Sequence, residues 1–171
     1  LQDYCNLIFN NQLNIIKENK KDLKLAKNKK LKENLIKRLL VDKKKIIQIL
    51  RSIKTIKKFK DPVNQVLESW ERSNGLKISK VTTSIGVIAV IYESRPNVTS
   101  DVASLCFKSG NPVILKGGSD AFYTNKMLTN LFNKALKKNK IDENFVQFIN
   151  YKNRRIVDYL LTKMMKYIDV I

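Results

Sequence analysis

Two short apolar runs in this sequence are each followed by residues that could hold an anionic ligand. Residues 85–91 lead into the polar corner Tyr92-Glu93-Ser94-Arg95-Pro96-Asn97, and residues 112–115 lead into Lys116-Gly117-Gly118-Ser119. The guanidinium of Arg95 presents a fork of donors that suits a phosphate or a carboxylate. Two consecutive glycines let a backbone come close to a ligand. The sequence therefore predicts a ligand site made by these two segments.

Each of these residues also has a purely structural interpretation. Lys116 could be one more surface lysine in a lysine-rich chain, and the two glycines after it could form an ordinary turn. Arg95 could pair with Glu93, and Asn97 could cap the helix that follows. Both kinds of interpretation stay open at the level of the sequence.

The elements that would position these residues alternate between strands and helices. The run 85–91 is rich in β-branched residues and is typical of a strand buried on both faces. We expect further strands at 112–115, 144–149 and 167–171, and helices at 98–108, 121–138 and 156–165. This alternation predicts a parallel sheet of four strands joined by right-handed crossovers. Ligands bind such sheets at the carboxyl ends of the strands, where the polar residues lie.

The residues before this alternation form two further parts. Residues 1–63 show apolar positions at helical spacing, with a polar break at 27–32 and an end at Lys60-Asp61-Pro62. In residues 64–83, strands at 66–69 and 76–82 flank Asn74-Gly75. This dipeptide favours a type I′ hairpin turn, because both central residues of that turn have positive φ.

The strings GVIAVIYESRPNVTSDVASLCFKSGN and VILKGG resemble the start of the coenzyme domain of the gamma-glutamyl phosphate reductases. This family, also called glutamate-5-semialdehyde dehydrogenases, belongs to the aldehyde dehydrogenase superfamily. Asp61-Pro62-Val63 and Lys166-Tyr167-Ile168-Asp169 add to the resemblance, which covers nearly the whole chain and less than half of the family's length. It implies an α/β fold with N-terminal helices (1–63), a β-hairpin arm of the oligomerisation type (64–83) and a partial Rossmann-like sheet (84–171).

The resemblance implies an enzyme that reduces L-glutamyl 5-phosphate with NADPH to L-glutamate 5-semialdehyde and phosphate, in proline biosynthesis. The residues that it assigns to NADP are Lys116, Gly117, Gly118, Ser119 and Tyr92. Those that it assigns to the crevice of substrate or cofactor are Glu93, Arg95, Pro96 and Asn97. Ser119 stands where the family usually has Lys, which weakens its assignment. The family's catalytic cysteine is expected beyond Ile171, so we expect a truncated, homo-oligomeric enzyme whose present chain is inactive alone.

The formal net charge of +19 allows a different function, a basic module that binds without catalysis. However, the basic residues are spread along the chain and lysine greatly outnumbers arginine. We interpret the charge as a bias of composition and expect no specific nucleic-acid partner. Another acyl or aldehyde reductase of the same superfamily is the second alternative.

Histidine is absent from the sequence, which excludes a histidine relay or a histidine metal site, and we expect no metal. The cysteines are Cys5 and Cys106. We expect Cys106 to be a buried apolar residue of helix 98–108 rather than a nucleophile. Two thiols without a signal segment indicate a reducing, cytoplasmic location. No apolar run approaches the roughly 20 residues of a membrane helix.

Overall fold

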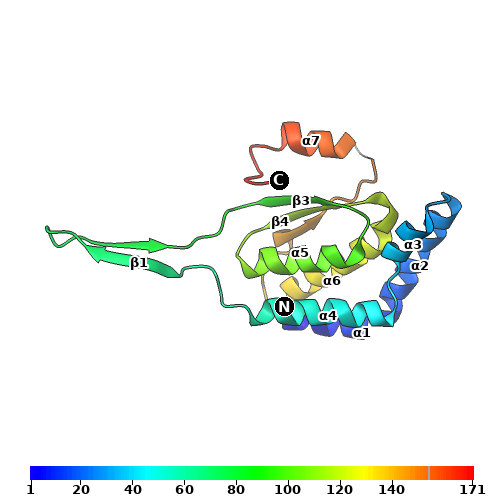
Figure 1. The fold of residues 1–171 in the computed structure, drawn as a ribbon, viewed down its shortest axis with the longest axis horizontal. Helices are drawn as coiled ribbons and strands as arrows, with labels where there is room; N and C mark the ends of the chain where they lie inside the picture. Colours follow the sequence, from blue (N-terminus) through cyan, green and yellow to red (C-terminus); the bar gives the residue numbers. More distant parts are fainter. Residues whose placement is uncertain (154) are drawn as a thin grey trace.

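The computed structural model describes residues 1–153 and 155–171 (Figure 1). The helices are α1 (Gln2–Asn10), α2 (Gln12–Asn28), α3 (Glu33–Leu39), α4 (Lys43–Lys58), α5 (Pro96–Lys108), α6 (Phe122–Lys138) and α7 (Arg155–Lys163), with short 3₁₀ turns η1 (Ser119–Ala121) and η2 (Glu143–Phe145). The strands are β1 (Val66–Glu71), β2 (Lys77–Val81), β3 (Ile88–Tyr92), β4 (Val113–Gly117) and β5 (Val146–Phe148). No described helix is long and apolar enough to cross a membrane.

A parallel sheet of three strands, in the order β3-β4-β5, organises the second half of the chain. Ile88 lies opposite Val113, which in turn lies opposite Val146. Helices α5 and α6 cover one face of the sheet and α7 lies on the other (Figure 1). The predicted α/β class and the parallel direction are confirmed. Both strand ends that carry the polar residues consequently reach the same edge.

The first strand begins later than predicted, at Ile88 instead of residue 85. Gly86 has a φ of 127°, and the amides of Ile85 and Gly86 donate to Asn111 Oδ1 over 2.7 and 3.1 Å. These amides are bound to a side chain and do not join the ladder. Burial on both faces is also wrong for this strand, because Ile91 is 40% exposed.

The fourth predicted strand, 167–171, is wrong. Only one bridge forms there, a parallel one between Ile88 and Val170. Asp169 N donates to Val87 O and Ala89 N donates to Val170 O, each over 2.8 Å. The carboxylate of Asp169 accepts a hydrogen bond from the Val87 amide over 2.7 Å. A side chain, rather than the backbone of a neighbouring strand, therefore satisfies this donor.

The hairpin predicted around Asn74-Gly75 is confirmed, since β1 and β2 pair antiparallel. The predicted type I′ turn is wrong, because Gly75 has a positive φ of 80° and Asn74 does not. Gly75 N donates to Arg72 O and Arg72 N to Leu76 O, each over 2.9 Å. This is the pattern of a longer loop that ends in a left-handed glycine. The Asn74 side chain accepts from Leu76 N at 3.1 Å, which holds the loop.

The N-terminal segment is helical, as predicted, but it contains two further breaks, at Asn11 and at residues 40–42. Asp42 begins α4 by accepting the Lys45 amide at 2.7 Å. The helices pack onto α5 and α6: the Tyr4 and Phe132 rings lie 4.5 Å apart, and both side chains are buried. The N-terminal helices and the sheet therefore share one hydrophobic core.

Candidate functional site

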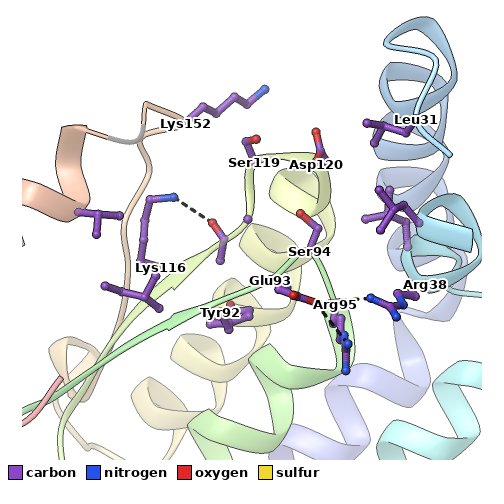
Figure 2. A pocket seen from close by; sticks show the side chains of 16 residues that line it. Leu31, Arg38, Tyr92, Glu93, Ser94, Arg95, Lys116, Ser119, Asp120 and Lys152 are labelled. Atoms are coloured by element: carbon purple, nitrogen blue, oxygen red, sulfur yellow. Dashed lines mark hydrogen bonds and ion pairs between the residues drawn. The ribbon is translucent and has the colours of Figure 1, made fainter.

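A cleft of about 490 Å³ opens at the carboxyl ends of β3 and β4 (Figure 2). Its floor comes from the corner after β3 and the turn after β4. Around it stand α3, the segment that precedes α7, and α7 itself. The lining residues are Leu31, Leu35, Arg38, Leu39, Ile91, Tyr92, Glu93, Ser94, Arg95, Lys116, Gly117, Gly118, Ser119, Asp120, Lys152 and Val157.

The structure brings most of the predicted site residues together in this cleft. The residues that line it are Tyr92, Glu93, Arg95, Lys116, Gly117, Gly118 and Ser119. Pro96 is buried as the first residue of α5. Asn97 does not line the cleft and borders a neighbouring hollow.

Lys116 is not an ordinary surface lysine, since it is only 7% exposed. Its ammonium donates to the carbonyl of Gly117 over 2.9 Å. Burial lowers the pKa of the Lys116 ammonium. Lys116 lies near the carboxyl end of β4, and its side chain lines the cleft. An anion bound in the cleft would offset the cost of burying the ammonium.

Gly117 and Gly118 are glycines because two strand ends approach each other closely. A Cβ on Gly117 would lie 3.0 Å from Tyr92 Cζ and would overlap the amide of Asn125. A Cβ on Gly118 would lie 2.8 Å from Ser94 N. Neither glycine has a positive φ, so the backbone conformation of the turn does not require glycine. Glycine is required because a side chain at either position would collide with its neighbours.

Tyr92 joins the end of β3 to α5. Its hydroxyl lies 2.7 Å from Thr99 Oγ1. Burial raises the pKa of Tyr92 to about 12, against the opposing effect of the Thr99 hydrogen bond. Tyr92 is therefore a neutral side chain at neutral pH, and it supplies a ring to the cleft wall.

Arg95 pairs with Glu93, which the sequence left open as an alternative to ligand binding. Arg95 Nη2 lies 3.3 Å from Glu93 Oε2, and Arg38 Nη1 from α3 lies 3.7 Å from the same oxygen (Figure 2). The cap of α5 is Arg95, so the alternative role of Asn97 as helix cap is wrong. Asn97 Nδ2 instead donates to Asp101 Oδ2 at 3.3 Å.

Two cations of the cleft, Arg38 and Lys152, were not predicted from the sequence. Lys152 Nζ lies 4.6 Å from the ring centres of both Phe122 and Tyr123, at the start of α6. No motif marks Lys152. Arg38 had one weak signal, that it is an arginine in a chain whose basic residues are mostly lysines.

Cys106 is 8% exposed and does not line the cleft. Burial raises the pKa of its thiol. The prediction that Cys106 is a buried side chain of α5 is confirmed, and its environment does not favour a thiolate.

The sheet and the helices around it match part of the fold of an aldehyde dehydrogenase. A probable aldehyde dehydrogenase from Listeria monocytogenes superposes on 98% of this chain with a TM-score of 0.66 at 11% identity. A much stronger match is the gamma-glutamyl phosphate reductase of Thermotoga maritima, with a TM-score of 0.95 and 36% identity over 98% of this chain and 41% of that one.

Sequence comparison agrees with this match. The gamma-glutamyl phosphate reductase of Nautilia profundicola is 44% identical over all 171 residues, and that of Petrotoga mobilis is 41% identical over 157 residues. No protein-family model matches the chain. The chain is homologous to the gamma-glutamyl phosphate reductases and spans about two fifths of the length of these relatives, 41% and 38%.

Proposed function

We propose that a protein containing this chain reduces L-glutamyl 5-phosphate with NADPH to L-glutamate 5-semialdehyde and phosphate, a step of proline biosynthesis in the cytoplasm. In this proposal the chain supplies the cofactor-binding part of the site. The main observation behind this proposal is that Lys116 is buried at the carboxyl end of β4 and lines a cleft together with residues of the β3 corner. Homology to the reductases supports the choice of substrate.

The cleft suits a nicotinamide dinucleotide in position, size and charge. It lies at the strand ends where such sheets bind ligands, and its volume of about 490 Å³ is in the range of small-molecule sites. Lys116 would contact the ribose at its 2′ position, where the 2′-phosphate of NADP favours a cation. The backbone of Gly117 and Gly118, with Ser119, would lie along the same ribose. When bound, the cofactor supplies the hydride.

The corner 92–97 would hold the reacting end of the substrate beside the cofactor. Pro96 occupies the first helical position, where its fixed φ suits the start of α5. This places Arg95 and Asn97 on either side of a rigid turn, and each would donate to an anionic group. Tyr92 would pack against the cofactor, and Glu93 would balance the charge of the arginine. The thiolate that attacks the acyl phosphate would come from outside this chain.

A turnover assay tests this proposal. NADP reduction is measured with glutamate 5-semialdehyde and phosphate, on this chain and on a fusion that adds the remaining C-terminal part of the Nautilia profundicola relative. We expect turnover from the fusion and none from the chain alone. Turnover by the chain alone that Cys106→Ser abolishes would contradict the assignment. Turnover that requires coenzyme A in place of phosphate would favour another acyl reductase.

We also propose that the β1–β2 hairpin is an oligomerisation arm. All residues of β1 are exposed, and the hairpin projects from the helices and the sheet (Figure 1). An isolated hairpin is marginally stable in water. Its exposed apolar side chains, such as Leu67 at 62% and Trp70 at 41%, are suited to contact another copy of the chain.

A further inference from the structure

A second hollow, of about 400 Å³, adjoins the cleft at the β3 corner. We call it the cationic hollow. It is bordered by Lys37, Arg38, Lys45, Arg95 and Asn97, together with two apolar side chains. These residues come from α3, from α4 and from the corner with the start of α5. Among the described residues that line the hollow, four are cations and none is acidic.

Arg38 and Arg95 belong to both the hollow and the cleft. They approach one oxygen of Glu93, at 3.7 and 3.3 Å, so that two guanidiniums share one carboxylate (Figure 2). Each guanidinium has five N–H donors, and these contacts use few of them. Only six of the 34 basic residues are arginines, so the bias toward lysine does not account for two arginines meeting here.

Of the other two cations of the hollow, Lys37 has an ion-pair partner, and that pair is weak. Lys37 pairs with Glu33 at 2.9 Å, but both side chains are largely exposed, at 74% and 81%, and such a pair contributes little. Lys45 is half-buried, whereas Lys43 and Lys44 beside it are exposed. The four cations of the hollow outnumber the two carboxylates that pair with them, Glu33 and Glu93, and a small anion would neutralise the remaining positive charge.

We infer that the cationic hollow binds an anionic end of the acyl-phosphate substrate, with Arg38, Arg95 and Lys45 as its principal contacts. The inference rests on the proposed function, in which the cofactor takes the adjoining cleft. Glu93 holds the two guanidiniums together until the anion arrives. The anionic group is a phosphate or a carboxylate, because glutamyl phosphate carries both and both match the guanidinium fork. The N-terminal helices thereby contribute to substrate binding.

The test is an NMR titration of this chain with inorganic phosphate and, separately, with L-glutamate, at constant ionic strength. The Nε–H signals of Arg38 and Arg95 report on binding, and the small number of arginines makes them assignable. We expect saturable shifts of both signals with at least one of the two anions. Shifts with phosphate alone assign the hollow to the phosphoryl end, and shifts with glutamate alone assign it to a carboxylate.

Two variants and two controls decide whether the shifts arise in the hollow. Arg38→Gln and Lys45→Gln should each weaken binding about tenfold, the effect of losing one charge-assisted hydrogen bond. Lys44→Gln and Arg51→Gln, exposed positions of the same helix α4 as Lys45, should leave binding unchanged.

Three results would overturn the inference: no saturable shift with either anion, equal binding by all four variants, or displacement of the anion by NADPH. Cofactor binding is read separately, from the amide signals of Gly117 and Gly118. A failure of the proposed function is therefore distinguishable from a failure of this inference.

Discussion

The carboxylate of Asp22 accepts two hydrogen bonds from Thr124, one from its backbone N–H over 2.8 Å and one from its hydroxyl over 2.6 Å. Tyr123 N adds a third at 3.0 Å, and Asp22 is 1% exposed. A residue of α2 thus caps α6, the helix that begins after the turn of Lys116. This contact consequently anchors the N-terminal helices to the helix that follows the Gly117-Gly118 turn.

The Asp22 cap predicts a specific effect on stability. Asp22→Ala should lower the free energy of unfolding by about 2–3 kcal/mol, because buried donors in α6 lose a charged acceptor. Urea denaturation measures this as a lower midpoint at an unchanged slope. Glu33→Gln, which removes an exposed ion pair, should change stability by less than about 0.5 kcal/mol. Equal effects of the two substitutions would contradict a structural role for the cap.

The elements around the site could be predicted because their signals are local. Apolar runs mark β3 and β4, and the polar residues of the corner and of Lys116 follow them directly in the sequence. Arg38 reaches the cleft from a helix in the other half of the fold. Its contact with Glu93 depends on tertiary packing, which no local pattern records.

The buried face of α5 shows a second limit of local patterns. In the sequence, the helical spacing of Val98, Val102, Leu105 and Cys106 predicts that these four side chains form the buried face. In the structure Leu105 is 46% exposed, and only Cys106 of the four is buried. The residues that α5 buries are mainly small or polar: Pro96, Thr99, Ser100, Ala103, Ser104 and Cys106. Two tyrosine hydroxyls explain part of this, because Tyr92 pairs with Thr99 at 2.7 Å and Tyr4 pairs with Ser100 at 2.8 Å.

Both cysteines should react slowly with iodoacetamide in the folded protein. Cys5 and Cys106 are 3% and 8% exposed, and burial raises the pKa of each thiol above its ordinary value of 9.0. The thiolate is the reactive form, so alkylation should still accelerate as the pH rises past 9. Peptide-resolved mass spectrometry measures the rates, with the urea-unfolded chain as control. Rapid alkylation of Cys106 at pH 7 would identify it as an activated nucleophile.

Gly117→Ala should destabilise the fold by about 1–3 kcal/mol, the typical effect of overpacking. The added methyl would press on the Tyr92 ring and the Asn125 amide. A double-mutant cycle with Asn125→Ala measures the cause, because removing the amide should recover part of the loss. Strictly additive effects of the two substitutions would show that the contact with Asn125 is not the reason why position 117 is a glycine.

The hairpin arm predicts association that depends on concentration. Sedimentation of this chain should show oligomers that Trp70→Lys weakens, because a charge would replace an apolar contact. Lys77→Gln on the paired strand serves as a control with little expected effect. Trp70 is the single tryptophan, so its emission should shift to shorter wavelength on association. A chain that remains monomeric at every concentration would count against the arm.

The central claim, that the cleft holds NADP through Lys116, is tested most directly by titrating this chain with NADPH and with NADH in a calorimeter. Lys116→Met keeps the apolar stem and removes the charge, and Lys126→Met is a control at a half-buried lysine of α6 that lies outside the cleft. We expect Lys116→Met to weaken NADPH binding about tenfold or more, and NADH binding less, because a cation beside a phosphate is a charge-assisted contact. Lys126→Met should bind like the unaltered chain. Equal losses for both cofactors, or NADPH binding that Lys116→Met leaves unchanged, would contradict the claim.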